Sequence, residues 1–132
     1  MIAGLRTCVA AGLLLALSAH GLAAEKFRRL TGAQIQGRFA GMELSDDVHW
    51  RDFYEPGGTL KSRSMGRHRT GTWSVRNDQL CLDLGADSGG CYEVWFAGSK
   101  VEFRRDGLEG AFLEGKLGKP GADSQTTKGK RQ

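Results

Sequence analysis

A short acidic run with nearby histidines is the first place in this sequence where metal or acid–base chemistry could occur. Asp46, Asp47 and His49 lie almost next to one another, and His68 follows further along the chain. Carboxylates and imidazoles bind metals, but no recognised ligand spacing connects these residues. Nothing in the sequence marks one carboxylate as buried, as paired acid–base catalysis would require. We therefore interpret the carboxylates as exposed turn residues and expect no metal and no cofactor.

A second candidate is the tetrapeptide Asp-Ser-Gly-Gly within Gly85–Gly90, which also surrounds the nucleophile of chymotrypsin-like proteases. That architecture needs two barrels, about twice this chain length, and a histidine and an aspartate upstream. Here Ala86 also stands where a glycine normally adjoins the aspartate. A polar hairpin loop explains the segment better. We assign no catalytic residues and lean towards a protein that is not an enzyme.

A basic segment follows an acidic one in the middle of the chain. The stretch 60–76 holds five basic residues and no acid, whereas 43–55 holds five acids and only Arg51. The basic stretch could bind a small anionic ligand or an acidic protein. Alternatively, the two stretches pair across a hairpin, each ion pair contributing a few tenths of a kcal/mol. Both interpretations stay open, and the candidate binding residues are Lys61, Arg63, Arg67 and Arg69.

Two tryptophans join the candidate binding residues. Trp73 is expected in the core, but the strand pattern puts Trp95 on the outer face of the sheet, and Trp50 is the other candidate. A large aromatic side chain on an outer face needs a cover. We favour packing of Trp95 under a helix at 31–40, with a contact surface for a partner as the alternative.

The two ends of the chain are interpreted as an export signal and a basic tail. Residues 1–24 combine Arg6, a short apolar core and small residues before Ala24, which is typical of a cleaved signal peptide and too short for a stable membrane anchor. Residues 118–132 are rich in Gly, Lys and Thr, which predicts disorder. Much of the net charge of +4 comes from this tail, so it does not argue for nucleic-acid binding.

Export decides the state of the cysteines. Cys8 would leave with the signal peptide, so the mature chain keeps Cys81 and Cys91. In the periplasm or outside the cell, two such cysteines pair by default. We therefore expect a disulfide between them.

The remaining residues, 25–117, are expected to form a single β domain with one short N-terminal helix. Thr31-Gly-Ala-Gln34 has the form of a capping box and predicts a helix to about Ala40, which Gly41 ends. From Met42 onward the apolar pattern has a period of two, interrupted by turn signals. Strands are expected near Met42–Leu44, Val48–Glu55, Thr59–Met65, Thr70–Arg76, Gln79–Leu84, Cys91–Phe96, Lys100–Arg105 and Glu109–Leu117.

Tight turns are expected at four two-residue connections, and their registers test one another. They are Gly57-Gly58, Asn77-Asp78, Gly98-Ser99 and Asp106-Gly107. The last three turns, together with a Cys81–Cys91 pair, place the apolar residues on one side of the sheet. That side would hold Trp73, Val75, Leu80, Leu82, Leu84, Tyr92, Val94, Phe96, Val101, Phe103 and Phe112. A one-residue slip would scramble this face. The pattern predicts a mainly β protein, an antiparallel meander of about seven or eight strands in a small barrel or half-barrel.

Several short motifs resemble a known group of proteins. Leu30-Thr-Gly32, Gly58-Thr-Leu60, Gly71-Thr-Trp73, Gln79–Asp83 and Cys91-Tyr92 resemble small exported proteobacterial proteins of unknown function, over roughly Leu30 to Leu117. Gly-Thr-Trp is also similar to a strand signature of lipocalins and avidins. The resemblance implies a calycin-like meander in the cell envelope, and it carries over no catalytic residues.

These observations favour an exported, monomeric, non-enzymatic module that binds a ligand or a protein in the periplasm or outside the cell. The partner would be an unknown protein or a small anionic ligand, with no nucleic acid and no stable membrane insertion. The alternative is a small periplasmic hydrolase or an enzyme inhibitor. A pocket with converging polar groups would discriminate between these classes.

Overall fold

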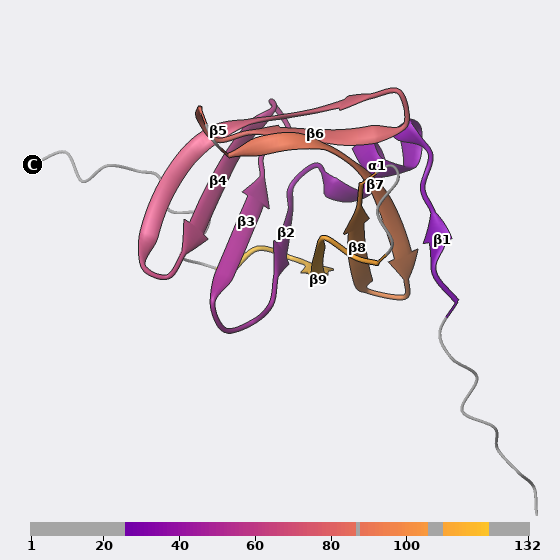
Figure 1. The fold of residues 1–132 in the computed structure, drawn as a ribbon. Coiled ribbons are helices and arrows are strands. Elements are labelled where there is room, and N and C mark those ends of the chain that lie inside the picture. The colour runs from indigo at the N-terminus through magenta and orange to yellow at the C-terminus, as the bar shows by residue number, and fades with distance from the viewer. Residues whose placement is uncertain (1–25, 87, 106–109, 122–132) are drawn as a thin grey trace, which may run out of the picture.

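The chain folds into a closed barrel of eight antiparallel strands, with one further strand outside it and one short helix (Figure 1). The computed structural model describes residues 26–86, 88–105 and 110–121. The elements are β1 (Arg28–Arg29), α1 (Gly32–Phe39), β2 (Met42–Ser45), β3 (Trp50–Tyr54), β4 (Thr59–Ser64), β5 (Arg67–Arg76), β6 (Gln79–Asp83), β7 (Gly89–Ala97), β8 (Lys100–Arg104) and β9 (Leu113–Gly118). The predicted β architecture with one N-terminal helix is confirmed, and β1 is an addition that the sequence pattern did not predict.

The barrel is a meander in which each strand from β2 to β9 pairs with the next, and β9 returns to pair with β2. Closure removes the exposed edges that an open sheet would present. The outer strand β1 pairs with the second half of β7, where Arg28 lies opposite Phe96. Consecutive connections of a meander alternate between the two ends of the barrel, so each end carries a different set of connections.

Most of the predicted registers are confirmed. Trp73 pairs with Leu82, and Val94 pairs with Phe103. Cys81 pairs with Cys91 and forms the expected disulfide, with an S–S distance of 2.06 Å.

The register predicted for the last hairpin is wrong. Phe103 pairs with Leu113, not with Gly110, and Val101 pairs with Gly115, not with Phe112. The connection before β9 is longer than a two-residue turn, and its predicted turn residues lie outside the described residues. Phe112 therefore precedes β9 and is 53% exposed. The β3–β4 turn is also one residue longer than predicted, since Glu55 already pairs with Thr59 through its N–H.

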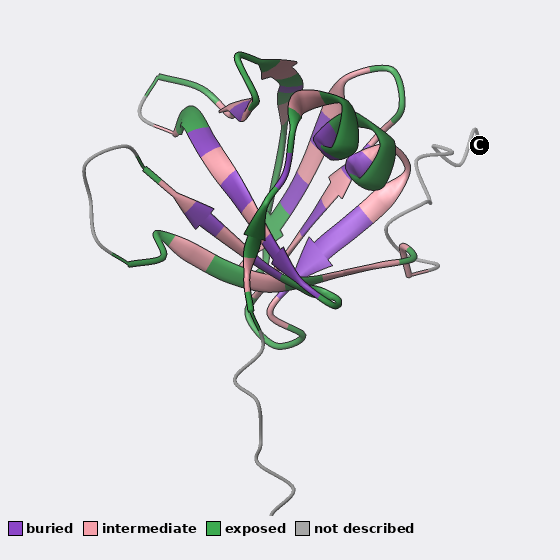
Figure 2. Ribbon diagram, turned by 90° about the vertical axis from the view of Figure 1, so that its right-hand side faces the viewer, coloured by how far each residue is buried: buried purple, intermediate pink, exposed green. Residues whose placement is uncertain are grey.

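Alternate residues of each strand point into the barrel, as the bands of buried residues in Figure 2 show. The interior carries the apolar core, consisting of Leu30, Ile35, Phe39, Leu44, Tyr54, Leu60, Trp73, Leu80, Tyr92, Val94, Phe96, Val101 and Phe103. The backbones of β5 and β6 approach closely at Gly71, where a Cβ atom would lie only 1.9 Å from the carbonyl oxygen of Asp83. Only glycine lets the two backbones come this close.

The helix α1 covers one end of the barrel, which we call the helix end. Thr31 and Gln34 form the predicted capping box. The N–H of Gly32 donates to Asp78 in the β5–β6 turn at 2.6 Å. The fully buried ring of Phe39 lies edge-on to Tyr54, with ring centroids 4.9 Å apart. The opposite end, which we call the loop end, is formed by the connections β2–β3, β4–β5, β6–β7 and β8–β9.

Candidate functional site

Polar side chains inside the barrel lie together on the loop-end half of β3, β4 and β5. Asp52 pairs with Ser62 across β3–β4, and Ser62 pairs with Arg69 across β4–β5. Asp52 is 9% exposed and Ser62 is 7% exposed, whereas Arg69 lies at the exposed rim. Arg69 donates from Nη1 to Ser88 Oγ at 2.8 Å, in the β6–β7 loop beside β5. We call Asp52, Ser62 and Arg69 the polar wall.

The carboxyl group of Asp52 binds its proton more tightly than an ordinary aspartate. Burial raises the pKa of Asp52, the hydrogen bond from Ser62 and the charge of Arg69 lower it, and the charge of Glu43 raises it. Burial has the largest effect, so the pKa ends above its ordinary value.

On the helix-end side of this wall, at the last residue of β3, lies a hydroxyl group without a partner. Tyr54 is fully buried, and its Oη has no hydrogen-bond partner among the described residues. Its ring is held edge-on against Phe39 and Trp73. Burial and the nearby charge of Asp52 raise the pKa of Tyr54 well above its ordinary value, so the hydroxyl keeps its proton. Leaving such a group unpaired costs stability, which makes it a candidate contact for a ligand.

Aromatic rings line the opposite side of the loop end. The ring of Tyr92 is stacked between Phe103 and Phe112, with centroid distances of 5.6 and 5.1 Å. The guanidinium of Arg105 lies 4.3 Å from the ring centroid of Phe112, and its Nη2 donates to Tyr92 Oη at 3.2 Å. We call Phe103, Tyr92 and Phe112 the aromatic wall. In the order of strands around the barrel, β7 and β8 lie opposite β3, β4 and β5, so the aromatic wall faces the polar wall.

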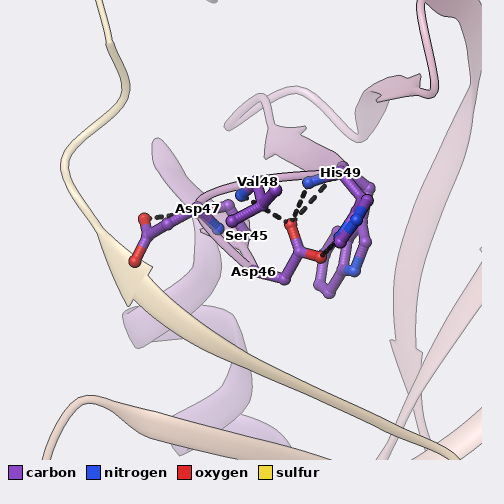
Figure 3. Close-up of polar contacts among 6 residues, drawn as sticks. Ser45, Asp46, Asp47, Val48 and His49 are labelled. Carbon is purple, nitrogen blue, oxygen red and sulfur yellow. Dashed lines mark hydrogen bonds and ion pairs between the residues drawn. The ribbon is translucent and has the colours of Figure 1, made fainter.

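The β2–β3 loop is ordered by one carboxylate (Figure 3). Asp46 Oδ1 accepts hydrogen bonds from the backbone N–H groups of Val48, His49 and Trp50 at 2.7–3.0 Å, and Oδ2 contacts His49 Nδ1 at 2.8 Å. Desolvation raises the pKa of Asp46, but the donated hydrogen bonds outweigh it and hold the pKa well below the ordinary value. Asp46 is therefore a structural residue of the loop.

Two pockets flank this loop. One, of about 270 Å³, lies between the β2–β3 loop and the β4–β5 turn, and its lining residues are Val48, His49, Trp50, Arg51, Arg63, Met65 and Gly66. The other, of about 430 Å³, lies on the outer surface of β8 and β9. Its lining residues are Phe27, Ser45, Asp46, Asp47, Lys100, Val101, Glu102, Glu114, Gly115 and Lys116. Both are open surface pockets rather than closed cavities.

The basic candidates from the sequence do not form one surface. Strand alternation turns Lys61 and Arg63 outward, whereas Arg67 and Arg69 lie on the inward side at the loop end. Lys61 Nζ lies 2.6 Å from a carboxylate oxygen of Glu55, so one of the predicted ion pairs between the acidic and basic stretches exists. The sequence pattern could have predicted these two faces, because Lys61 and Arg63 precede the β4–β5 turn and Arg67 and Arg69 follow it.

Trp95 has a different cover from the one we favoured. It lies on the outer face as predicted, but Arg104 covers its ring and β1 pairs with β7 beside it, whereas α1 lies over the end of the barrel. The Arg104 guanidinium is 4.2 Å from the Trp95 ring centroid, and the indole N–H donates to Glu93 at 3.1 Å. These contacts leave Trp95 partly buried within the protein.

Trp50 lies on the inner side of β3, where its ring approaches β9. A Cβ atom on Gly115 would lie 3.0 Å from the indole Cη2 of Trp50. Among the inward groups, sequence reasoning missed Asp52, Ser62 and Tyr54. The period-two pattern of β3 does place Asp52 and Tyr54 on the same face as Trp50. Which face of β3 points inward follows only from its pairing with the strands that carry Leu44 and Leu60.

Two negative findings hold for the part of the chain that the structure describes. It contains no group of three or more His, Cys, Asp or Glu side chains that could hold a metal ion. It also contains no helix that is long and apolar enough to cross a membrane. In comparisons with known proteins, no family model, no curated protein and no solved structure matches this chain.

Proposed function

We propose that this protein is an exported, non-enzymatic binding module that takes a small ligand through the loop end into the interior of its barrel. The observation that carries the proposal is the buried and unpaired hydroxyl of Tyr54 beside the polar wall. A barrel filled only for stability would place apolar side chains here, because buried polar groups without partners destabilise a fold. Polar groups retained at such a cost are typical of binding sites.

The two walls suggest the chemistry of the ligand. The aromatic wall offers stacked rings at the mouth, which suits a flat apolar body. Arg69 and Arg105 place two guanidinium groups near the same mouth, which suits an anionic group. The hydroxyl of Tyr54 would donate to an acceptor on the ligand. We therefore propose a small aromatic or apolar anion as the ligand class.

Export supports the same assignment. The residues 1–24 have the composition of a signal peptide, and the Cys81–Cys91 disulfide suits an oxidising compartment. The resemblance to small exported proteobacterial proteins, and to the calycin-type meander, is part of this proposal. The periplasm or the extracellular space is the expected location.

A hydrolase remains the competing class because the raised pKa of Asp52 would also suit a general acid. A binding module retains its ligand unchanged, whereas a hydrolase releases products. Incubating the protein with the methyl ester of the probe described next, which carries a hydrolysable bond, and looking for released 2-naphthoate by mass spectrometry separates the two classes for that compound.

The proposal is tested with 2-naphthoate, which combines a flat aromatic body with a carboxylate. Titration is followed by ¹H–¹⁵N NMR with the mature protein and with Tyr54→Phe. We expect shifts at the polar and aromatic walls, and about tenfold weaker binding by the variant, because one hydrogen bond to a charged acceptor is lost. Lys61→Ala, on the outer face, should bind as the wild type does. Shifts confined to the outer surface, or equal affinity of Tyr54→Phe, would refute the proposed site.

A further inference from the structure

The most exposed large apolar side chains of the described residues all lie at the loop end. They are Val48, Met65 and Phe112, with exposed fractions of 78%, 76% and 53%. Each comes from a different connection, namely β2–β3, β4–β5 and β8–β9. Single exposed apolar residues are ordinary on a protein surface. Three of them on three loops of one end, with none at the helix end of the described chain, form a directed pattern.

The backbone at Met65 shows that folding does not explain this residue. Met65 and Gly66 form the tight β4–β5 turn with φ values of 49° and 81°. A positive φ favours Gly, Asn or Asp and disfavours other side chains. At the helix end, the turn Asn77-Asp78 adopts the same conformation, with φ values of 52° and 57°, and uses the favoured residues. Met65 is thus neither buried nor suited to its backbone, which points to a contact outside the protein.

Between two of these apolar tips lies a basic pocket. Val48 and Met65 line the pocket of about 270 Å³ together with His49, Arg51 and Arg63. Arg51 and Arg63 are direct partners across β3–β4, so their side chains leave the same face of the sheet side by side. Arginine pairs of this kind suit phosphate, because the planar guanidinium donates two hydrogen bonds at once.

Asp46 and Asp47 of the same loop make contacts with their own loop and with Lys116, and Arg51 and Arg63 have partners within the protein as well. Asp46 accepts from the backbone of its own loop and from His49. The Asp47 carboxylate lies 3.8 Å from Lys116 Nζ and also contacts the hydroxyl of Ser45. Arg67 adds another exposed cation at the start of β5. The end of the barrel therefore combines apolar tips with arginines close behind them.

We infer that the loop end docks reversibly on an anionic lipid bilayer, with Val48, Met65 and Phe112 entering the interface and the Arg51–Arg63 pocket receiving a lipid phosphate. Apolar tips with cations close behind them match the order of layers in a bilayer surface, where acyl chains lie beneath phosphates. A soluble phosphate would use the arginines but not the tips. The inference shares Phe112 with the aromatic wall, but it is tested at Met65 and Arg63, which belong to neither wall of the proposed ligand site.

The test is co-sedimentation of the mature protein with two kinds of vesicle, phosphatidylcholine alone and phosphatidylcholine mixed with phosphatidylglycerol. We expect binding to the anionic vesicles only, weakened by salt. Met65→Asn should bind about tenfold more weakly, since one partly inserted apolar side chain is lost. Arg63→Gln should bind about fivefold more weakly. Thermal unfolding should show that Met65→Asn is at least as stable as the wild type, since Asn suits the turn.

A matched control places the same side chain at the other end of the barrel. Asn77→Met adds an apolar tip at the helix end, and it should leave vesicle binding unchanged. A protein that binds inorganic phosphate, followed by NMR shifts at Arg51 and Arg63, but no vesicles would have only an anion pocket, and the inference would be wrong. Equal vesicle binding by the wild type and Met65→Asn, or equal binding to both vesicle types, would also overturn it. None of these outcomes alters the 2-naphthoate test, so the two proposals can fail separately.

Discussion

The hydroxyl of Ser62 donates a hydrogen bond to the carboxyl group of Asp52 inside the barrel, and the two residues are direct partners across β3–β4. This pair puts a titratable group where burial disfavours its charge. Since the pKa of Asp52 is raised in the folded protein, the folded state binds its proton more tightly than the unfolded state does. Protein stability should therefore fall as pH rises from the ordinary value of 3.8 through the raised value.

The first prediction follows from this sign. Asp52→Asn imitates the neutral acid and still accepts from Ser62, so its stability should not fall with pH in this way. At a pH above the raised pKa of Asp52, the variant should be more stable than the wild type. A displacement of the pKa by one unit corresponds to about 1.4 kcal/mol. Urea unfolding of both proteins over a pH series that brackets the window measures the difference. Parallel stability curves would show that Asp52 does not titrate as described.

Asp46 should behave in the opposite way. Its pKa is lowered in the folded protein, so its contribution is present above the ordinary value of 3.8 and is lost as pH falls below that value. Asp46→Ala removes the acceptor of three backbone N–H groups and should destabilise the protein at neutral pH, with a smaller effect in acid. The same unfolding series checks this. Equal losses at neutral and acid pH would contradict the electrostatic part of the explanation.

Two tyrosine hydroxyls provide a matched comparison. Tyr54→Phe removes an unpaired buried hydroxyl and should stabilise the free protein by about 1 kcal/mol. Tyr92→Phe removes a hydroxyl that accepts from Arg105, and it should destabilise the protein by about 1 kcal/mol. Thermal and urea unfolding without ligand give both values. A loss of stability in Tyr54→Phe would mean that its hydroxyl has a partner.

Two glycines test the packing of the barrel. Gly71→Ala would place a Cβ atom 1.9 Å from a backbone oxygen, so β5 and β6 would have to separate, at a cost of roughly 2–4 kcal/mol. Gly37→Ala, in α1, would meet nothing within 4 Å and should stabilise the protein by about 0.5–1 kcal/mol through helix propensity. Unfolding by urea distinguishes them. Similar small effects in both variants would show that the barrel does not need the close approach at Gly71.

The disulfide gives a prediction about both stability and compartment. It closes a short loop, with a sequence separation of 10, so the double variant Cys81→Ser/Cys91→Ser should lose about 2.5 kcal/mol on the chain-entropy estimate. Alkylation of the natural protein without reductant should leave its mass unchanged. An alkylated mass of the mature chain would show free thiols at Cys81 and Cys91 and would contradict the predicted export.

Much of the fold could be predicted because its signals are local. The capping box at Thr31 and Gln34 defines the helix start, and period-two alternation with turn residues defines the strands. The turn Asn77-Asp78 sets one register, and the Cys81–Cys91 pair sets the next. The last hairpin could not be predicted in the same way, because its connection is longer than the two residues that would have fixed its register.

The sequence by itself determined the β class, the single helix, the disulfide pair and most of the apolar residues that share one face, with Phe112 as the exception. Only the tertiary structure decided what lies inside. Closing β9 onto β2 turned one face of the sheet into an interior, and this brought Asp52, Ser62 and Tyr54 together with Arg69 at the mouth. It also gathered Val48, Met65 and Phe112 at one end, although they are far apart in the chain. Closure depends on pairing between distant strands, which no local pattern encodes, and both candidate sites arise from it.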